Sequence, residues 1–207
     1  MSQAPGPFRL PCMLTWIIRN RLRAFEREWD YDMSYARALL DADVRAFMAF
    51  AKTRGMGKYR KDIPRDVGYA AGITGTMVED CGPCTQLGVA MAERMGVDPK
   101  VIRAVLTETP VMMPPDVALA WRFTRATLEH DPSADQYRDE IIKRWGPRAV
   151  VTLAFAILTA RMYPTVKYAM GHGKACTRIV VGGAPLAFDK SLSGPAEAGH
   201  YTAVQRR

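Results

Sequence analysis

The chain has 207 residues, a formal charge of +8, a hydrophobic fraction of 48% and a charged fraction of 24%. This length allows one domain with a core large enough to fold without a disulfide framework, and the composition excludes the disordered and fibrous classes. The positive charge would suit nucleic acid or an anionic membrane. However, the basic residues are dispersed and no zinc-finger, helix-turn-helix or RNA-binding signature accompanies them, so we expect no nucleic-acid partner.

The first residues lack a charged segment followed by an apolar stretch and a small-residue cleavage site. That pattern predicts a cytoplasmic protein. The longest apolar run, 149–160, is too short to span a bilayer of about 30 Å and is bounded by Arg148 and Arg161. We therefore interpret it as a buried core helix and expect no transmembrane segment.

Apolar residues recur at helical spacing over 13–28 and 35–51, which predicts two amphipathic helices. A basic, glycine-containing loop separates this pair from a weaker helix over 65–76. Three glycines in that helix either allow a close helix approach or lower its stability by about 1 kcal/mol each; they are Gly68, Gly72 and Gly75.

Later helices are delimited by capping residues, glycines and prolines. Asp80 precedes a helix that ends near Gly96, and the pair Asp98 and Pro99 begins the next. Further helices are predicted over 115–129, 134–145 and 147–170, the last with a kink at Pro164.

Strand signals are scarce, with β-branched density only over 178–181. The predicted fold class is therefore all-α, without a sheet of three or more strands. We divide the chain into an N-terminal helical extension of two helices and a basic loop (1–61), a helical core (62–181) and a flexible tail (182–207). The tail is assigned from its Gly, Ala, Ser, Pro and charged composition, which lacks apolar periodicity.

The stretch Asp80-Cys81-Gly82-Pro83-Cys84 carries the clearest chemical signal. With Asp80 as N-cap, Cys81 is the first helical residue and Cys84 lies one turn on. Residues three apart share a helix face at about 5 to 6 Å, a separation that a disulfide can bridge. The helix dipole also favours a thiolate, lowering the thiol pKa from about 8.5. The motif thus predicts a pair that cycles between dithiol and disulfide.

Three other interpretations of the pair compete with redox chemistry. A zinc site needs two more ligands, for which only Cys176 with His172 is available, so no metal is expected. A structural disulfide is improbable in a reducing compartment, whereas two unreactive buried cysteines remain an alternative. A thioredoxin-like fold needs a strand before Cys81, but helices are predicted on both sides of the motif.

Three neighbouring features of the chain together resemble the carboxymuconolactone decarboxylase and alkylhydroperoxidase D superfamily. They are the helix before the motif, the CxxC that opens a second helix ending at Gly96, and the start of the next helix in Val97-Asp98-Pro99-Lys100-Val101-Ile102. The resemblance is good over about 62–106 and extends through the helices to 181. It implies an AhpD-like all-α bundle with the CxxC at the N-terminus of a central helix, a homo-oligomer, and no bound cofactor. The cysteines of that family reduce hydroperoxides with electrons from an external dithiol, which can be a lipoyl group.

Two positions depart from the peroxidase pattern. The family histidine four residues after the second cysteine is Gly88 here, and the glutamate twelve residues before the first cysteine is Tyr69. The usual proton relay is therefore missing. The decarboxylase branch lacks the cysteine pair and its histidine has no counterpart here, so a decarboxylase ranks below a redox protein.

Another group must then handle protons, and Glu79, two residues before Cys81, is the nearest candidate. It either accepts a thiol proton or only contributes charge at the helix start. Gln86 either orients a water or substrate oxygen or is a surface amide. His172 is a turn histidine or a base supplied from another helix or subunit.

The sequence thus predicts a thiol-dependent, peroxidase-like oxidoreductase with Cys81, Cys84 and Glu79 as its catalytic residues. Its substrate would be a hydroperoxide or another small molecule, and a dithiol would donate the electrons. The alternative is a non-catalytic helical binding or scaffold protein that retains a redox pair and docks through the basic amphipathic helix 13–28.

Overall fold

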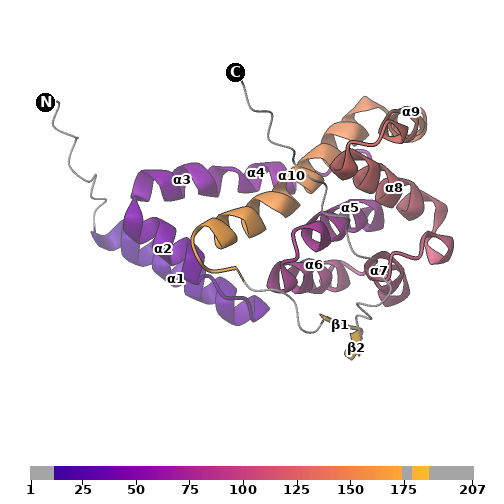
Figure 1. Cartoon of the computed structure of the whole chain (residues 1–207). Helices are drawn as coiled ribbons and strands as arrows, with labels where there is room; N and C mark the ends of the chain where they lie inside the picture. Colours follow the sequence, from indigo (N-terminus) through magenta and orange to yellow (C-terminus); the bar gives the residue numbers. More distant parts are fainter. Residues whose placement is uncertain (1–11, 174–178, 187–207) are drawn as a thin grey trace, which may run out of the picture.

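The computed structural model describes residues 12–173 and 179–186 (Figure 1). The all-α prediction is confirmed, because α-helices make up nearly all the regular structure of these residues. The strands described are β1 (Ile179–Val181) and β2 (Ala184–Leu186), an antiparallel hairpin with Ile179 opposite Leu186.

The N-terminal region contains α1 (Cys12–Trp29), α2 (Ser34–Ala42), α3 (Val44–Lys52) and the short α4 (Arg54–Lys58). A single helix was predicted over 35–51, and this was wrong at Asp43. That residue has an extended backbone, and its carboxylate accepts a hydrogen bond of 2.6 Å from the backbone N–H of Arg45. An aspartate that binds nearby N–H groups competes with helix continuation, so α2 ends and α3 begins there.

The remaining helices follow in chain order as α5 (Arg65–Val78), α6 (Gly82–Arg94), α7 (Pro99–Leu106), the 3₁₀ turn η1 (Pro110–Met112), α8 (Pro115–Glu129), α9 (Ser133–Trp145) and α10 (Pro147–Ala169). Asp98 caps α7 by accepting from the N–H of Lys100 at 2.8 Å. These helices enclose the larger apolar cluster, and α5 packs against α6, α7, α8 and α10 within it.

Gly75 lies where α5 packs against α10. A Cβ atom there would lie 2.9 Å from the Cβ of Ala160, whereas one at Gly72 would meet no atom within 4 Å. Close approach is therefore the role of Gly75. Gly72 has no such packing role, because its added methyl would face open space.

A second, smaller apolar cluster joins the N-terminal helices to the CxxC motif. Its members include Leu22, Tyr35, Leu40, Phe47 and both motif cysteines. Figure 1 shows α1, α2 and α3 on the same side of the molecule as the C-terminal half of α10. The N-terminal helices, which were expected to form an extension, therefore cover the CxxC motif.

The C-terminal tail was predicted to begin at 182, and this was wrong for its first residues. β2 pairs with β1, and the hairpin is fixed by side chains from the helices: Glu93 accepts from the N–H of Gly182 at 2.5 Å, and Arg103 donates to the carbonyl of Val181. Long-range hydrogen bonds of this kind leave no periodic signal in a five-residue segment. Residues 187–207 lie outside the described part of the chain.

By length and composition alone, α10 is sufficiently apolar to cross a bilayer, and a third of its most apolar window is buried in this structure. Core helices of soluble proteins meet the same criterion, so this observation does not assign a membrane span.

Candidate functional site: a buried dithiol

The turn between α5 and α6 places the two cysteines. Asp80 has a left-handed backbone, with φ of 46°, and its carbonyl accepts a hydrogen bond from the Tyr168 hydroxyl at 2.9 Å. Cys81 is extended and is the N-cap of α6, and its carbonyl accepts the N–H of Thr85 at 2.9 Å. The prediction that Asp80 caps the helix was therefore wrong by one residue, since the left-handed turn at Asp80 shifts the helix start to Gly82.

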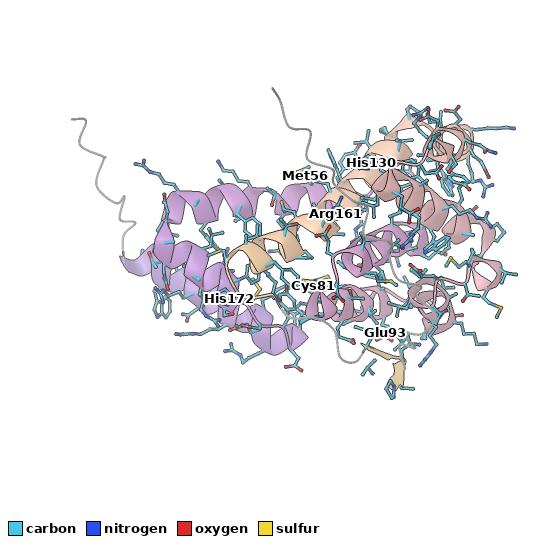
Figure 2. The ribbon with its side chains drawn as sticks, viewed as in Figure 1. Met56, Cys81, Glu93, His130, Arg161 and His172 are labelled. Atoms are coloured by element: carbon cyan, nitrogen blue, oxygen red, sulfur yellow. The ribbon has the colours of Figure 1, made fainter. Side chains whose placement is uncertain are left out.

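Both thiols are free and lie beneath the N-terminal helices. Cys81 is 0% exposed and Cys84 is 6% exposed. Figure 2 shows Cys81 at the start of α6, with the N-terminal helices to its left and α5 to its right. A reactant must therefore be small, or the covering helices must move to admit it.

The two thiols differ in their affinity for a proton. Hydrogen bonding with the Cys84 side chain is the main influence that lowers the pKa of Cys81 to about 7; burial raises it, and the Lys167 charge lowers it further. The pKa of Cys84 is raised, first by its interaction with Cys81 and then by burial. The pair therefore shares one proton near neutral pH, with the negative charge on Cys81.

A tyrosine and a lysine from opposite ends of the chain complete the site. The hydroxyl of Tyr31 lies 3.4 Å from the Cys84 sulfur, within the range of a sulfur hydrogen bond. The Lys167 Nζ donates to that same hydroxyl at 3.4 Å and lies 4.5 Å from the centre of the Tyr31 ring. Lys167 is only 1% exposed. A buried ammonium is costly unless it is compensated, so this lysine is a candidate functional group.

The two tyrosines nearest the lysine remain protonated. Burial is the largest cause that raises the pKa of Tyr31, and the neighbouring Cys84 raises it further. Burial and Cys84 likewise raise the pKa of Tyr35, whose ring centre lies 5.5 Å from the Lys167 Nζ. Neither phenol therefore serves as an anion that would compensate the lysine.

Glu79, the predicted general base, interacts with α10. Arg161 donates to one carboxylate oxygen, and the Thr165 hydroxyl lies 3.5 Å from the other. Its side chain is 17% exposed, and Figure 2 shows Arg161 on α10. The structure gives Glu79 a structural partner, while its role as a base stays a prediction.

Gln86 and His172 also have defined partners. The Gln86 amide donates to the carbonyl of Val180 at 3.1 Å and accepts its N–H at 2.8 Å, so it binds β1 in the manner of a neighbouring strand. Because both ends of the amide bind β1, this arrangement does not support a role for Gln86 in orienting a substrate oxygen. The His172 Nδ1 lies 2.9 Å from the Ser34 hydroxyl, which also donates to Asp32 at 3.0 Å. His172 thus connects the end of α10 to α2.

The positions that depart from the peroxidase pattern are used for packing. A Cβ atom at Gly88 would lie 3.4 Å from Ile73 of α5. Tyr69 is buried, and the guanidinium of Arg60 lies 4.2 Å from the centre of its ring. No proton relay of the family type is built at these two positions.

Sequence reasoning missed Tyr31 and Lys167. Lys167 left one signal, because it is an isolated charge between Val166 and Tyr168 in an otherwise apolar helix end. Tyr31 left none, because it lies in the short connection between α1 and α2.

A shallow depression adjoins the site. Glu26, Asp30, Tyr31 and Asp32 line it, and its volume is about 340 Å³. Tyr31 is therefore placed between this surface and Cys84. Among the residues in 12–173 and 179–186, no group of three or more His, Cys, Asp and Glu side chains is placed to hold a metal ion. Cys176, considered as a zinc ligand, lies outside these residues.

The fold and site define a helical protein with two buried, free thiols close to a buried lysine. Comparison with family models, curated proteins and solved structures gave no match. The functional argument therefore depends on the site itself.

Proposed function

We propose that the protein is a thiol-dependent, peroxidase-like oxidoreductase in which Cys81 is the attacking thiolate and Cys84 the resolving thiol. The observation that carries this proposal is a pair of free thiols one helical turn apart at the start of α6, where Cys81 is the N-cap and the Tyr31 hydroxyl lies 3.4 Å from the Cys84 sulfur. The lowered pKa of Cys81 and the raised pKa of Cys84 support the assignment of their roles. The thiolate is the nucleophilic form of cysteine.

The reaction proceeds in two balanced steps. The Cys81 thiolate attacks the terminal oxygen of a hydroperoxide, the O–O bond breaks, and the alkoxide that leaves takes a proton from solvent to become an alcohol. Cys81 is now a sulfenic acid. Cys84 then loses its proton and attacks the Cys81 sulfur, forming the disulfide and releasing hydroxide, which becomes water. A dithiol donor, such as a lipoyl group, returns two electrons and two protons.

Burial of the thiols supports a small substrate. Neither sulfur is open to a bulky reactant, because Cys81 is fully buried and Cys84 nearly so. A small hydroperoxide fits this restriction better than a protein disulfide does. Reduction by a larger dithiol would then require the cover formed by α1, α2 and α3 to move.

The finer assignment to an AhpD-like bundle belongs to the same proposal. Its support is the sequence resemblance together with the helical fold and the position of Cys81 at the N-cap of α6. Glu79 is assigned to holding the turn between α5 and α6 through Arg161. A homo-oligomer and an external dithiol donor follow from the resemblance.

The test is a single turnover with hydrogen peroxide, followed by mass mapping. The wild-type chain should form a Cys81 to Cys84 disulfide, and Cys84→Ser should accumulate a sulfenic acid at Cys81 that dimedone traps. Cys81→Ser should consume no peroxide, whereas Cys12→Ser should match the wild type. Peroxide consumption in the Cys81→Ser variant would contradict the proposal.

Burial of the same thiols also favours the alternative of a helical binding protein with a retained redox pair. A folded wild-type chain that neither consumes peroxide nor forms the disulfide would support that alternative.

A further inference from the structure

Lys167 is a buried charge whose compensation is unusual. Its Nζ donates a hydrogen bond to the Tyr31 hydroxyl, and two aromatic rings face it. None of the ion pairs found among the described residues includes it. Aromatic faces compensate a cation only in part. The remaining negative partner is the dithiol, on which the Lys167 charge acts at both sulfurs.

Tyr31 connects this lysine to Cys84. Lys167 has no acceptor capacity as an ammonium and donates to the phenol oxygen. The phenol hydrogen is therefore available to two acceptors, the Cys84 sulfur 3.4 Å away and the Tyr35 side chain, and a thiolate is the stronger acceptor of the two. A donor chain thus runs from Lys167 through Tyr31 to Cys84, and it has the polarity that stabilises a thiolate.

We propose that Tyr31 and Lys167 form a donor chain that stabilises the Cys84 thiolate during disulfide closure, with Tyr31 as the catalytic residue and Lys167 as its positioning residue. This inference rests on the proposed function and adds the group that replaces the missing family relay. The donor chain of Lys167 and Tyr31 acts in the second chemical step, which is closure of the disulfide.

The order of events follows from charge. In the reduced protein the Cys81 thiolate is the counter-ion of Lys167, and its presence opposes ionisation of Cys84. Oxidation of Cys81 to the sulfenic acid removes that negative charge. The Tyr31 hydrogen bond and the Lys167 charge, both of which lower the pKa of Cys84, then act without opposition. Cys84 loses its proton, which combines with the hydroxide released from Cys81 when the disulfide forms.

The experiment separates the two chemical steps. Wild type, Tyr31→Phe, Lys167→Met and Lys167→Arg are mixed with hydrogen peroxide and quenched at intervals with acid. Blocked thiols, the dimedone-trapped sulfenic acid and the disulfide are then counted by mass. Tyr163→Phe is the matched control, because Tyr163 lies on α10 near Lys167 and the groups that act on its hydroxyl are Thr53 and Arg54 rather than the thiols.

We expect Tyr31→Phe to form the Cys81 sulfenic acid at nearly the wild-type rate but to close the disulfide about tenfold or more slowly, the scale of a lost hydrogen bond to a charged group. Lys167→Met should slow both steps and shift the pH midpoint of Cys81 alkylation upward. Lys167→Arg should restore that midpoint, and Tyr163→Phe should behave as wild type.

Two results would overturn the inference. One is a Tyr31→Phe variant that closes the disulfide at the wild-type rate. The other is an equal slowing of both steps that Tyr163→Phe reproduces, which would indicate a purely structural role. A wild-type protein that forms no sulfenic acid and no disulfide would instead refute the proposed function, so the two failures are distinguishable.

Discussion

At Cys81 two opposite charges act on one sulfur. The Lys167 ammonium lowers the thiol pKa, while the carboxylate of the adjacent Asp80 raises it. Because both act on a buried sulfur, water screens them less than it would at the surface. The nucleophilicity of the site is thus set by a balance that single substitutions can change.

Asp80→Asn should make Cys81 more reactive below neutral pH. Asparagine tolerates the left-handed backbone of this position, so the turn should persist while the negative charge is lost. The wild-type iodoacetamide labelling rate should rise through pH 7, because the thiolate fraction rises there. In the variant the midpoint should be lower. A midpoint that is unchanged or higher would contradict this account of the site.

Glu79→Gln tests whether this carboxylate is a base or a structural partner. If it only holds Arg161, peroxide turnover should stay within a few-fold of the wild type. The melting temperature should fall, because Arg161 loses a charged partner in a partly buried pair. A loss of about 10²-fold in turnover, the scale of a positioned general base, would instead restore the catalytic role predicted from sequence.

At the scale of the elements, the crossing of α5 and α10 holds the motif in place. α5 ends just before Cys81, and α10 carries Lys167, Arg161 and Tyr168. These side chains all contact the motif or its immediate surroundings. The distance between the two helix axes therefore sets the position of the lysine relative to the thiols.

Gly75→Ala and Gly72→Ala should change stability in opposite directions. At Gly75 the new methyl would lie 2.9 Å from Ala160, so overpacking should lower the free energy of unfolding by about 1 to 3 kcal/mol. At Gly72 the new methyl would meet no atom of another part of the molecule within 4 Å, so the substitution should raise the free energy of unfolding by about 0.5 to 1 kcal/mol through helix propensity. Urea denaturation of the two variants measures both, and destabilisation by Gly72→Ala would contradict the assignment.

At the scale of the whole molecule, the surface of α10 carries an apolar stripe. Val151 is 42% exposed and Leu158, two turns further on, is 51% exposed, with exposed Ala154 between them. If the protein is a homo-oligomer, as the family resemblance predicts, this stripe is a suitable contact face.

Val151→Glu with Leu158→Glu should lower the molar mass measured by light scattering at micromolar concentration. Buried like charges at a two-fold contact are strongly unfavourable. The matched control is Val111→Glu, because Val111 is 85% exposed in η1 and lies on a different element. A wild-type protein that is already monomeric would contradict the prediction of a homo-oligomer.

The sequence by itself determined the local features. Apolar spacing predicted most of the helices, Asp98 and Pro99 predicted the start of α7, and the three-residue spacing placed Cys81 and Cys84 within one helical turn. These features depend on interactions within a turn or two of chain, for which residue type and spacing are sufficient. The one-residue error at Asp80 shows the limit, because its left-handed backbone is stabilised by Tyr168 from α10.

Only the tertiary structure decided which groups surround the thiols. Tyr31 lies 53 residues from Cys84 in sequence and 136 from Lys167, and Gln86 binds β1 94 residues away. These long-range contacts depend on how helices cross and on how deeply each side chain is buried, and no local sequence pattern encodes either property. For the same reason the sequence does not reveal the role of the Lys167 charge. That charge acts on the two thiols only because the packing of α1, α2 and α10 buries it beside the cysteine pair.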